Sequence, residues 1–366
     1  MSISGDTMNR GFCLRGAVCA ALFAASSGVA QTTQYIKDGV YDPATPERRG
    51  QAGATFLQVG ASARAEGMGG AFAGVRGDPA IAFYNPAGVA EVTGVAFSAD
   101  HTKWVADMSL NGLVVAARAR FVSLGVSFLS MDYGSFDGTR IADNAAGYES
   151  IGAVTPTAWA LGGIAAVKFT DRFNAGIQTK WLVQDIGESE VYTFRNPPRY
   201  TGEMTKNRVS TWAIDLGTQY YTGLRNLSIN MTLQNFGGTQ KYVETTFSLP
   251  LTYRVGVSAE LMEFVTGDAT GAHKVFLSME GVDRRNVSLD GAIGAEYTGD
   301  MSDFVPGLSV SVRAGRRPAR NQDGWMSFGG GVCFPVTGVK MGLDYSFNDY
   351  GPHLSVHRVG MRASLR

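Results

Sequence analysis

Apolar and polar residues alternate along most of the chain from about residue 94 onward. In the clearest stretch, Leu227, Ile229, Met231 and Leu233 interleave with serine, asparagine, threonine and glutamine. A period of two places successive side chains on opposite faces of a strand. Such segments run about 9 to 14 residues here, whereas strands of soluble sheets have about 5 to 6 and strands crossing a bilayer need about 9 to 11. The pattern predicts long strands with one apolar and one polar face.

Fourteen such segments follow one another, and an even number is typical of bacterial outer-membrane barrels. We therefore predict an all-β fold, a closed antiparallel transmembrane β-barrel of about 14 strands over residues 94–366, in the bacterial outer membrane. The predicted strands are 94–104, 109–118, 120–132, 157–169, 173–187, 209–222, 226–237, 249–261, 274–283, 287–298, 307–316, 324–334, 338–348 and 353–366.

The connections between these segments differ in length in a regular way. Barrels of this class have short turns on the periplasmic side and long loops outside. Here, tight connections near residues 119, 171, 224 and 336 alternate with long ones at 133–156, 188–208 and 238–248, and the connections at 262–273 and 299–306 depart from the rule.

Closure has a physical cause, because lipid offers no hydrogen-bond partners to an unpaired sheet edge. A secreted β-sandwich or propeller would also alternate, but sandwich strands are shorter and no blade repeat is present. Charged residues of both signs fall on the predicted inner face, which favours ion-pair networks over the alternative of a selective ion path. They are Asp215, Arg254, Glu260, Glu280, Glu296, Arg313, Lys340 and Asp344.

Tryptophans lie near the predicted strand ends, where an aromatic girdle would meet the membrane interface. They are Trp104, Trp159, Trp181, Trp212 and Trp325.

Composition narrows the choice of function. The 32 Lys+Arg residues cancel the 32 Asp+Glu residues, which removes the electrostatic argument for nucleic-acid binding. No run of 18 apolar residues occurs, so a bundle of transmembrane helices is excluded. Glycine contributes 47 of the 366 residues, about 13% against roughly 7% in average proteins.

The first 30 residues have the order of a secretory signal peptide. Arg10 and Arg15 precede an apolar stretch at 16–25, and small residues lead to Ala30. Residues 31–55 are polar and read as a periplasmic leader. Cys13 and Cys19 would leave with the signal, so Cys333 would remain alone and no intramolecular disulfide could form.

Residues 56–93 have another character, rich in glycine and alanine and without a period of two. Such a stretch packs closely against other backbone, so we predict an N-terminal hatch, or plug, inside the barrel. Gly67, Gly69 and Gly70 suggest a phosphate loop only superficially, because Phe72 occupies the third glycine position and no Lys-Ser/Thr pair follows.

Two blocks within this stretch resemble the N-terminal signature of the PorV/PorQ family. They are FLQVGASARAEGMGGAF, from Phe56 to Phe72, and DPAIAFYNPAGVA, from Asp78 to Ala90. That family is similar to the fatty-acid channel FadL, a fourteen-stranded outer-membrane barrel with an N-terminal hatch. The resemblance covers about 35 residues and identifies as hatch-motif residues Gly60, Arg64, Gly67, Met68, Gly69, Gly70, Phe72, Asp78, Asn85, Pro86, Ala87 and Gly88.

The resemblance implies a part in type IX protein secretion, with the secretion translocon, cargo or surface-attachment proteins as partners alongside outer-membrane lipid. The alternative is a FadL-like transporter of a hydrophobic small molecule. An apolar pocket reaching from the surface into the barrel would favour transport. A barrel occluded by residues 56–90, with no apolar channel, would favour partner binding.

Sequence motifs for catalysis are missing. No HExxH, G-x-S-x-G or CxxC motif occurs, and the four histidines are scattered. We therefore expect a non-enzyme without cofactor or metal. The aromatic residues in the long connections 133–156 and 188–208 are candidates for a partner-binding surface, although simple loop variability would also account for them. They are Tyr133, Phe136, Tyr148, Tyr192, Phe194 and Tyr200.

Overall fold

The structure is a computed structural model that describes residues 52–193, 199–242, 245–266, 272–285, 287–317, 325–351 and 354–365. These residues belong to one compact unit of the chain. The predicted signal peptide, and the predicted leader up to residue 51, lie outside the described residues. Within the described part, no helix has the length and apolarity needed to cross a membrane.

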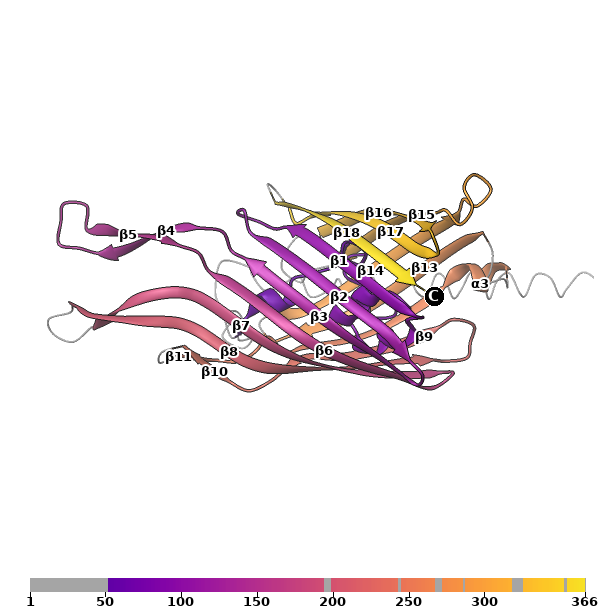
Figure 1. Ribbon diagram of the computed structural model, residues 1–366, viewed down its shortest axis with the longest axis horizontal. Coiled ribbons are helices and arrows are strands. Elements are labelled where there is room, and N and C mark those ends of the chain that lie inside the picture. The colour runs from indigo at the N-terminus through magenta and orange to yellow at the C-terminus, as the bar shows by residue number, and fades with distance from the viewer. Residues whose placement is uncertain are drawn as a thin grey trace, which may run out of the picture. The chain divides into compact units, whose positions relative to one another are not determined.

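Fourteen antiparallel strands close into a barrel, with the first strand paired to the last (Figure 1). The predicted fold class is therefore confirmed, and every predicted strand overlaps an observed one. The barrel strands are β1 Val95–Lys103, β2 Ser109–Ala119, β3 Val122–Asp132, β6 Thr157–Thr170, β7 Phe173–Thr193, β8 Arg199–Tyr221, β9 Ser228–Phe236, β12 Thr252–Glu260, β13 His273–Arg284, β14 Val287–Asp300, β15 Ser309–Arg317, β16 Trp325–Val336, β17 Val339–Asp349 and β18 Ser355–Leu365.

Alternation along each strand separates an outer apolar face from an inner polar one. On β17, Leu343 and Tyr345 are 52% and 45% exposed, whereas Ser346 and Asn348 are fully buried inside. The predicted inner charges Asp215, Arg254, Glu280, Glu296, Arg313 and Asp344 are all buried. Glu260 is half-buried and Lys340 is exposed, since both lie where the lumen opens.

The two ends of the barrel differ in their connections. At one end, here called the tight-turn end, β2–β3, β6–β7 and β16–β17 are joined by two residues each. At the opposite end, here called the long-loop end, the connection 133–156 holds a separate hairpin of β4 Phe136–Ile141 and β5 Tyr148–Val154. The connection after β9 holds β10 Gln240–Tyr242 and β11 Thr245–Phe247, and helix α3 Leu261–Thr266 follows β12 at the tight-turn end.

The predicted long loop at 188–208 is wrong. β7 and β8 remain paired as far as Thr193 and Arg199, well beyond the ends of the neighbouring strands. The backbone ladder continues there, but the apolar alternation fades because an outer face beyond the bilayer need not be apolar. The alternation in the sequence therefore predicts only the part of β7 and β8 whose outer face is apolar.

Three of the five tryptophans predicted for the girdle lie together on the outer face of the barrel, and their place at the membrane interface stays a prediction. Trp159, Trp181 and Trp212 lie on adjacent strands with ring centroids 5.5 and 6.0 Å apart, and Trp212 is 60% exposed. Trp104 is different, because its ring packs against Tyr350 at 5.5 Å and against apolar residues of the interior. The side chain of Trp325 lies outside the described residues.

Residues 56–93, called the hatch from here on, fold inside the barrel as short helices. They are η2 Thr55–Gln58, α2 Ala63–Gly67, η3 Pro79–Phe83 and η4 Pro86–Glu91. Helix α2 contacts β15 to β18 and β1, η3 contacts β1 and β2, and η4 contacts β3, β6, β7 and β8. The chain enters the barrel at the long-loop end, where Ala52 forms a β-bridge with Ser248. It continues from the hatch into β1 at the tight-turn end.

Candidate functional site

Glycines on the inner wall bring the hatch backbone against the barrel. A Cβ atom on Gly176 of β7 would overlap the backbone of Pro86 and Ala87, and one on Gly315 of β15 would overlap Met68 and Gly69. The Cα of Gly67 lies 3.1 Å from the Cβ position of Gly329 on β16. Part of the high glycine content is therefore explained, because wall positions facing the hatch have no room for a side chain.

Asn85 connects the hatch to itself and to the wall. Its side-chain oxygen accepts a hydrogen bond from the Ala87 backbone N–H at 3.1 Å, which caps η4. Its Nδ2 donates to the carbonyl oxygens of Ala73, at 2.9 Å, and Thr218 on β8, at 3.1 Å. Asp78 caps η3 in the same way, accepting from the Ala80 N–H. In both caps, a proline follows as the first helical residue, where its missing N–H costs nothing.

Three arginines and three carboxylates form a closed ring of alternating charge, here called the charge ring. Arg64 and Asp78 come from the hatch, and the other members come from β14, β15, β17 and β18. Every member pairs with two of opposite charge, so no buried charge is left uncompensated. The N–O contacts are Arg64–Asp78 2.7 Å, Asp78–Arg362 3.2 Å, Arg362–Asp344 3.2 Å, Asp344–Arg313 2.8 Å, Arg313–Glu296 2.5 Å and Glu296–Arg64 2.5 Å.

Electrostatics reinforce the hatch side of the charge ring. Burial acts to raise the pKa of the Asp78 carboxyl, but the adjacent Arg64 and Arg362 guanidiniums outweigh it, so that pKa lies below its usual range. Asp78 therefore remains ionised at neutral pH and holds both arginines. The predicted inner charges thus form a network that joins hatch to wall.

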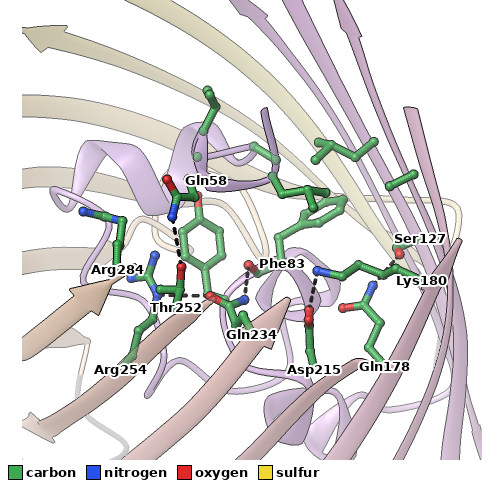
Figure 2. A pocket seen from close by; sticks show the side chains of 17 residues that line it. Gln58, Phe83, Ser127, Gln178, Lys180, Asp215, Gln234, Thr252, Arg254 and Arg284 are labelled. Atoms are coloured by element: carbon green, nitrogen blue, oxygen red, sulfur yellow. Dashed lines mark hydrogen bonds and ion pairs between the residues drawn. The ribbon is translucent and has the colours of Figure 1, made fainter. Parts of the chain in front are cut away.

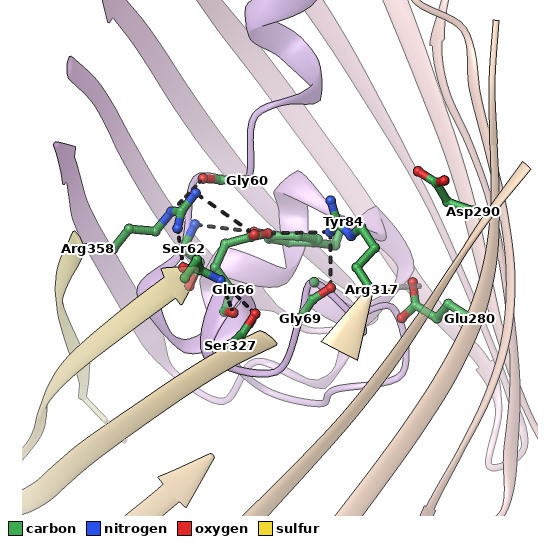
Figure 3. Close-up of polar contacts among 12 residues, drawn as sticks. Gly60, Ser62, Glu66, Gly69, Tyr84, Glu280, Asp290, Arg317, Ser327 and Arg358 are labelled. Carbon is green, nitrogen blue, oxygen red and sulfur yellow. Dashed lines mark hydrogen bonds and ion pairs between the residues drawn. The ribbon is translucent and has the colours of Figure 1, made fainter. Parts of the chain in front are cut away.

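A second polar cluster surrounds Glu66 of α2 (Figure 3). Tyr84 donates a hydrogen bond to Glu66 Oε1 at 3.1 Å, and Arg317 and Arg358 of the wall approach the carboxylate at 4.0 Å each. Burial acts to raise the pKa of Glu66, but these two guanidiniums and the tyrosine hydroxyl bring it below its usual range. Asn348 of β17 also donates to the Glu66 carbonyl oxygen at 2.8 Å.

A third contact fixes the chain between α2 and η3. Glu280 of β13 accepts a hydrogen bond from the Ala73 N–H at 2.6 Å and pairs with Arg254 of β12 at 3.3 Å. Arg254 also donates to the Gly70 carbonyl oxygen at 3.3 Å. Backbone groups of the hatch are therefore satisfied by wall side chains, as buried backbone groups require.

The opposite part of the wall is apolar, and we call its inward side chains the apolar seam. The inward residues of β2 from Leu110 to Ala116, and those of β6 from Ala158 to Ala166, are aliphatic residues, alanine or glycine. The members of the apolar seam are at most 6% exposed. These side chains belong to two clusters, an upper one towards the long-loop end with Leu110 and Leu129, and a lower one with Val114 and Ile164. Phe83 of η3 packs against both clusters, and Phe56 belongs to the upper one. The apolar seam comprises Leu110, Val114, Ala116, Leu129, Met131, Ala158, Ala160, Ile164 and Ala166.

A cavity of about 30 Å³ lies where the upper part of the apolar seam meets the polar wall (Figure 2). Leu57, Leu129 and Ala160 contribute apolar surface to it. On its other side, Lys180 pairs with Asp215 at 2.8 Å, and Gln178 donates to Ser127 at 2.5 Å. The cavity has room for about one water molecule. The described hatch therefore leaves almost no free space beside this part of the apolar seam.

The predicted hatch-motif residues all lie in the described part of the chain and face the wall or the hatch interior. Met68 and Phe72 are fully buried, and the Phe72 ring meets Tyr84 edge-on at 5.3 Å. Gly69 and Gly70 have φ of 65° and 76°, which favours glycine. Gly88 packs against Ile81, and the Gly60 carbonyl accepts from Arg358 at 3.3 Å.

Of the predicted loop aromatics, the structure describes the side chains of Tyr133, Phe136 and Tyr148, and these differ in their surroundings. Tyr133 is half-buried, packs on the upper apolar cluster and accepts a long hydrogen bond from Gln184. Phe136 and Tyr148 are 51% and 56% exposed on the β4–β5 hairpin. Tyr192 and Tyr200 face each other as a backbone pair of β7 and β8. Phe194 lies outside the described residues.

Sequence reasoning missed the wall partners of the hatch. No hatch partner was predicted for Arg317, Arg358 or Arg362, although Arg358 and Arg362 fall on the inward, polar face of the predicted last strand. The hatch carries the carboxylates Glu66 and Asp78, and arginines occupy inward positions of β15 and β18. This match of charges was the signal that could have predicted the contacts.

The fold defines a class, an outer-membrane-type β-barrel whose lumen is filled by its own N-terminal segment. Among solved structures, the chain is similar to the toluene transporter TodX of Pseudomonas putida, with a TM-score of 0.54 and 11% identity over 83% of this chain and 96% of that one. It is also similar to a FadL homologue of Pseudomonas aeruginosa, with a TM-score of 0.47 and 9% identity over 83% and 97%. At 11% identity the likeness to TodX shows the fold alone.

Comparison with known family models finds no match, and no curated protein matches the sequence significantly. The fourteen-stranded barrel with an N-terminal hatch that the sequence resemblance implies is the fold observed. The narrower PorV/PorQ assignment stays a prediction.

Proposed function

We propose that this chain is a non-enzymatic outer-membrane barrel that takes a hydrophobic small molecule along its apolar seam. The observation that carries the proposal is the division of the lumen into two unlike sides. Arg313 and Asp344 lie on the charged side, whereas β2 and β6 present aliphatic and small side chains inward. An inner wall that served only to hold a plug by ion pairs would not need an apolar strip running along β2 from Leu110 to Ala116 and along β6 from Ala158 to Ala166.

The apolar seam supplies a path but not an open pore, and an occluded lumen is the outcome expected for partner binding. The proposal of transport therefore rests on the apolar lining of β2 and β6 and not on an open channel. Phe56 and Phe83 cover the seam, and the cavity beside its upper part measures about 30 Å³. Passage therefore requires the hatch to shift away from β2, β3 and β6 while its ionic contacts on the far side hold. Along the apolar seam itself these contacts are non-directional, and a hydrophobic guest replaces them without leaving polar groups unpaired. Near the tight-turn end, the Arg118 bond to the Ala90 carbonyl and the Lys168–Glu91 pair would also have to hold or reform.

Similarity of fold to a protein described as a toluene transporter supports the same reading. It does not identify the molecule carried. The proposed class is thus an uncharged or mainly apolar compound small enough to lie between the wall and the η3–η4 segment.

The test is uptake by cells of a bacterial host that lacks its own channel for such compounds. Labelled toluene and labelled oleate are the two probes. Cells producing the wild-type chain should accumulate at least one of them faster than empty-vector cells. Uptake equal to the empty vector for both probes would contradict the proposal.

Neighbouring positions on β6 offer a matched pair of variants. Ala160 faces the cavity and is 3% exposed, whereas Leu161 faces outward and is 44% exposed. Ala160→Leu overpacks the seam and should reduce uptake several-fold, while Leu161→Phe should leave it unchanged. Heat-modifiable migration on gels confirms that each variant has formed a barrel.

A second candidate, partner binding in type IX secretion, is favoured by the β4–β5 hairpin. This hairpin is exposed along nearly all its length and carries the aromatic side chains of Phe136 and Tyr148. Arg140 anchors it through Glu149, within the hairpin, and Glu190 of β7, at 2.7 Å. Replacing residues 136–154 by a short turn should abolish co-purification of secretion proteins if this role holds, and should leave uptake intact.

A further inference from the structure

A second cavity, of about 540 Å³, opens at the tight-turn end of the barrel below the hatch. Its inner boundary is formed by four members of the charge ring, namely Arg64, Asp78, Glu296 and Arg362. Its walls come from the ends of the charged strands, and Lys274, Lys340 and Phe276 lie among them. The apolar seam contributes nothing to this cavity, so it is a separate site from the proposed path.

The lining carries an excess of positive charge. Five cationic side chains, Arg64, Arg76, Lys274, Lys340 and Arg362, face three carboxylates, Asp78, Glu260 and Glu296. Asp78 and Glu296 are already held by arginines of the charge ring. Glu260 accepts hydrogen bonds from the backbone N–H groups of Val275, at 2.6 Å, and Met262, at 3.4 Å.

Two of the cations have no ionic partner within the part of the chain that the structure describes. Neither Lys274 nor Lys340 comes within ion-pair distance of a carboxylate there. Asp300, at the end of β14, accepts from the Ser302 backbone N–H at 2.9 Å and interacts electrostatically with both lysines from beyond ion-pair distance. The two ammonium groups are exposed to the cavity, so an incoming anion need not break an existing pair to reach them.

Strand register brings Lys340 close to a charge-ring arginine. Lys340 pairs directly with Ser364, and the next inward pair along the same two strands is Gly342 with Arg362. Diagonal neighbours of this kind lie about 7 to 8 Å apart at their Cα atoms. Because Gly342 has no side chain, Arg362 is accessible from Lys340, and one oxyanion can contact both side chains, with the Ser364 hydroxyl as a neutral donor.

The opposite side of the cavity repeats this chemistry and adds an apolar surface. Lys274 pairs in register with Thr298, whose hydroxyl bonds Ser311 at 2.9 Å. Phe276 lines the cavity one inward position further along β13. A bound molecule therefore meets cationic and hydroxyl donors at its ends and an aromatic ring between them.

We propose that this cavity binds a small organic anion, its carboxylate or phosphate group held by Lys340 and Arg362 and its apolar part lying against Phe276. Such a site goes beyond the uptake of a hydrophobic molecule, since it lies on the opposite side of the hatch and selects charge. An oxyanion on Arg362 competes with Asp78 for the same guanidinium, which couples occupancy of the site to the charge ring.

Cys333 provides a reporter within the cavity. It lines the cavity, is half-buried and has a free thiol. Full-length protein carrying Cys13→Ser and Cys19→Ser is purified in detergent, and Cys333 is modified with thiosulfonate reagents of matched size, one anionic and one cationic. Fields of a charged cleft raise association rates by about tenfold or more, so the anionic reagent should react about ten times faster relative to the cationic one than it does with a free thiol.

Benzoate and phenyl phosphate are the ligand probes. Either should slow modification of Cys333 in a saturable way, and their relative strength tells a carboxylate site from a phosphate site. Benzylammonium, of the same size and opposite charge, should not protect. Equal protection by benzylammonium, or an anionic-to-cationic rate ratio no greater than that of a free thiol, would overturn the proposal.

The variant Lys274→Gln/Lys340→Gln should bring the rate ratio close to the free-thiol value and weaken benzoate protection. The matched control removes two cations at the long-loop end, Arg140→Gln and Lys206→Gln, and should leave the ratio unchanged. Neither readout depends on uptake, so this proposal and the proposed function fail independently.

Discussion

Asp78 and Arg362 stand 284 positions apart in the sequence, yet Asp78 Oδ2 lies 3.2 Å from Arg362 Nη1. One residue belongs to the hatch and the other to the last strand. Through Arg64, the same carboxylate is also coupled to Glu296 of β14. Most ionic contacts between hatch and wall therefore lie on the side of β14 to β18, while Lys168 of β6 pairs with Glu91 of η4 at 3.6 Å on the other side.

Removing one carboxylate of the charge ring should loosen the hatch. Glu296→Gln keeps the size of the side chain but leaves Arg64 and Arg313 each with one carboxylate instead of two. Breaking a buried ion pair by removing one partner costs about 3 to 5 kcal/mol. We expect a lower thermal unfolding midpoint and frequent ion-conducting openings in planar bilayers.

The exposed pair Lys206–Glu188, 3.6 Å apart, provides the control. Lys206→Gln should change neither the midpoint nor the conductance, because such surface pairs contribute little. If Glu296→Gln conducts no more than Lys206→Gln, the charge ring does not hold the hatch.

Two glycines on neighbouring strands test the close packing of hatch and wall. Gly176→Ala places a methyl group into the backbone of Pro86 and Ala87, whereas Gly163→Ala meets nothing within 4 Å. We expect Gly176→Ala to displace η4 and expose the hatch to protease added to purified protein. Gly163→Ala should match wild type. Equal protease resistance of the two variants would show that η4 can shift without cost.

Two substitutions of Asn85 distinguish its role as the cap of η4 from its role in attaching the hatch to the wall. Asn85→Asp keeps an oxygen that accepts from the Ala87 N–H but loses the donor to Ala73 and Thr218. Asn85→Ala loses both functions, and an N-cap is worth about 1 kcal/mol. Both variants should increase hydrogen exchange of the Ala87 amide, and Asn85→Ala should do so more strongly. A wild-type rate in Asn85→Asp would mean that the two bonds donated by Nδ2 are dispensable.

The depressed pKa of Glu66 sets the direction of its pH dependence. Because that pKa lies below the unfolded value of about 4.3, the carboxylate contributes its full stability above pH 4.3 and loses it as the pH falls through the folded-state pKa. Glu66→Gln should therefore lower the thermal midpoint at pH 7, and its difference from wild type should shrink below about pH 4. A difference that stays constant down to pH 3 would assign the effect to packing instead.

The strand number and positions could be predicted from sequence because lipid imposes a strict period of two on each crossing. The extensions of β7 and β8 could not, since residues such as Glu188 and Lys206 lie where no apolar face is required. The hatch was recognisable from glycine and alanine content. Its contacts were not, because pairing Asp78 with Arg362 depends on the register of the whole barrel and on where η3 enters it.

The closing pair of strands bears on how the molecule is assembled. β18 pairs with β1 and carries both Arg358 and Arg362, which contact Glu66 and Asp78 of the hatch. Until that last strand is in place, Asp78 has Arg64 and Glu66 has Arg317 but each lacks its second arginine, and the sheet has two open edges. Closure of the barrel and completion of the hatch contacts therefore occur in the same step of assembly. A partly assembled barrel cannot hold the hatch in its final position.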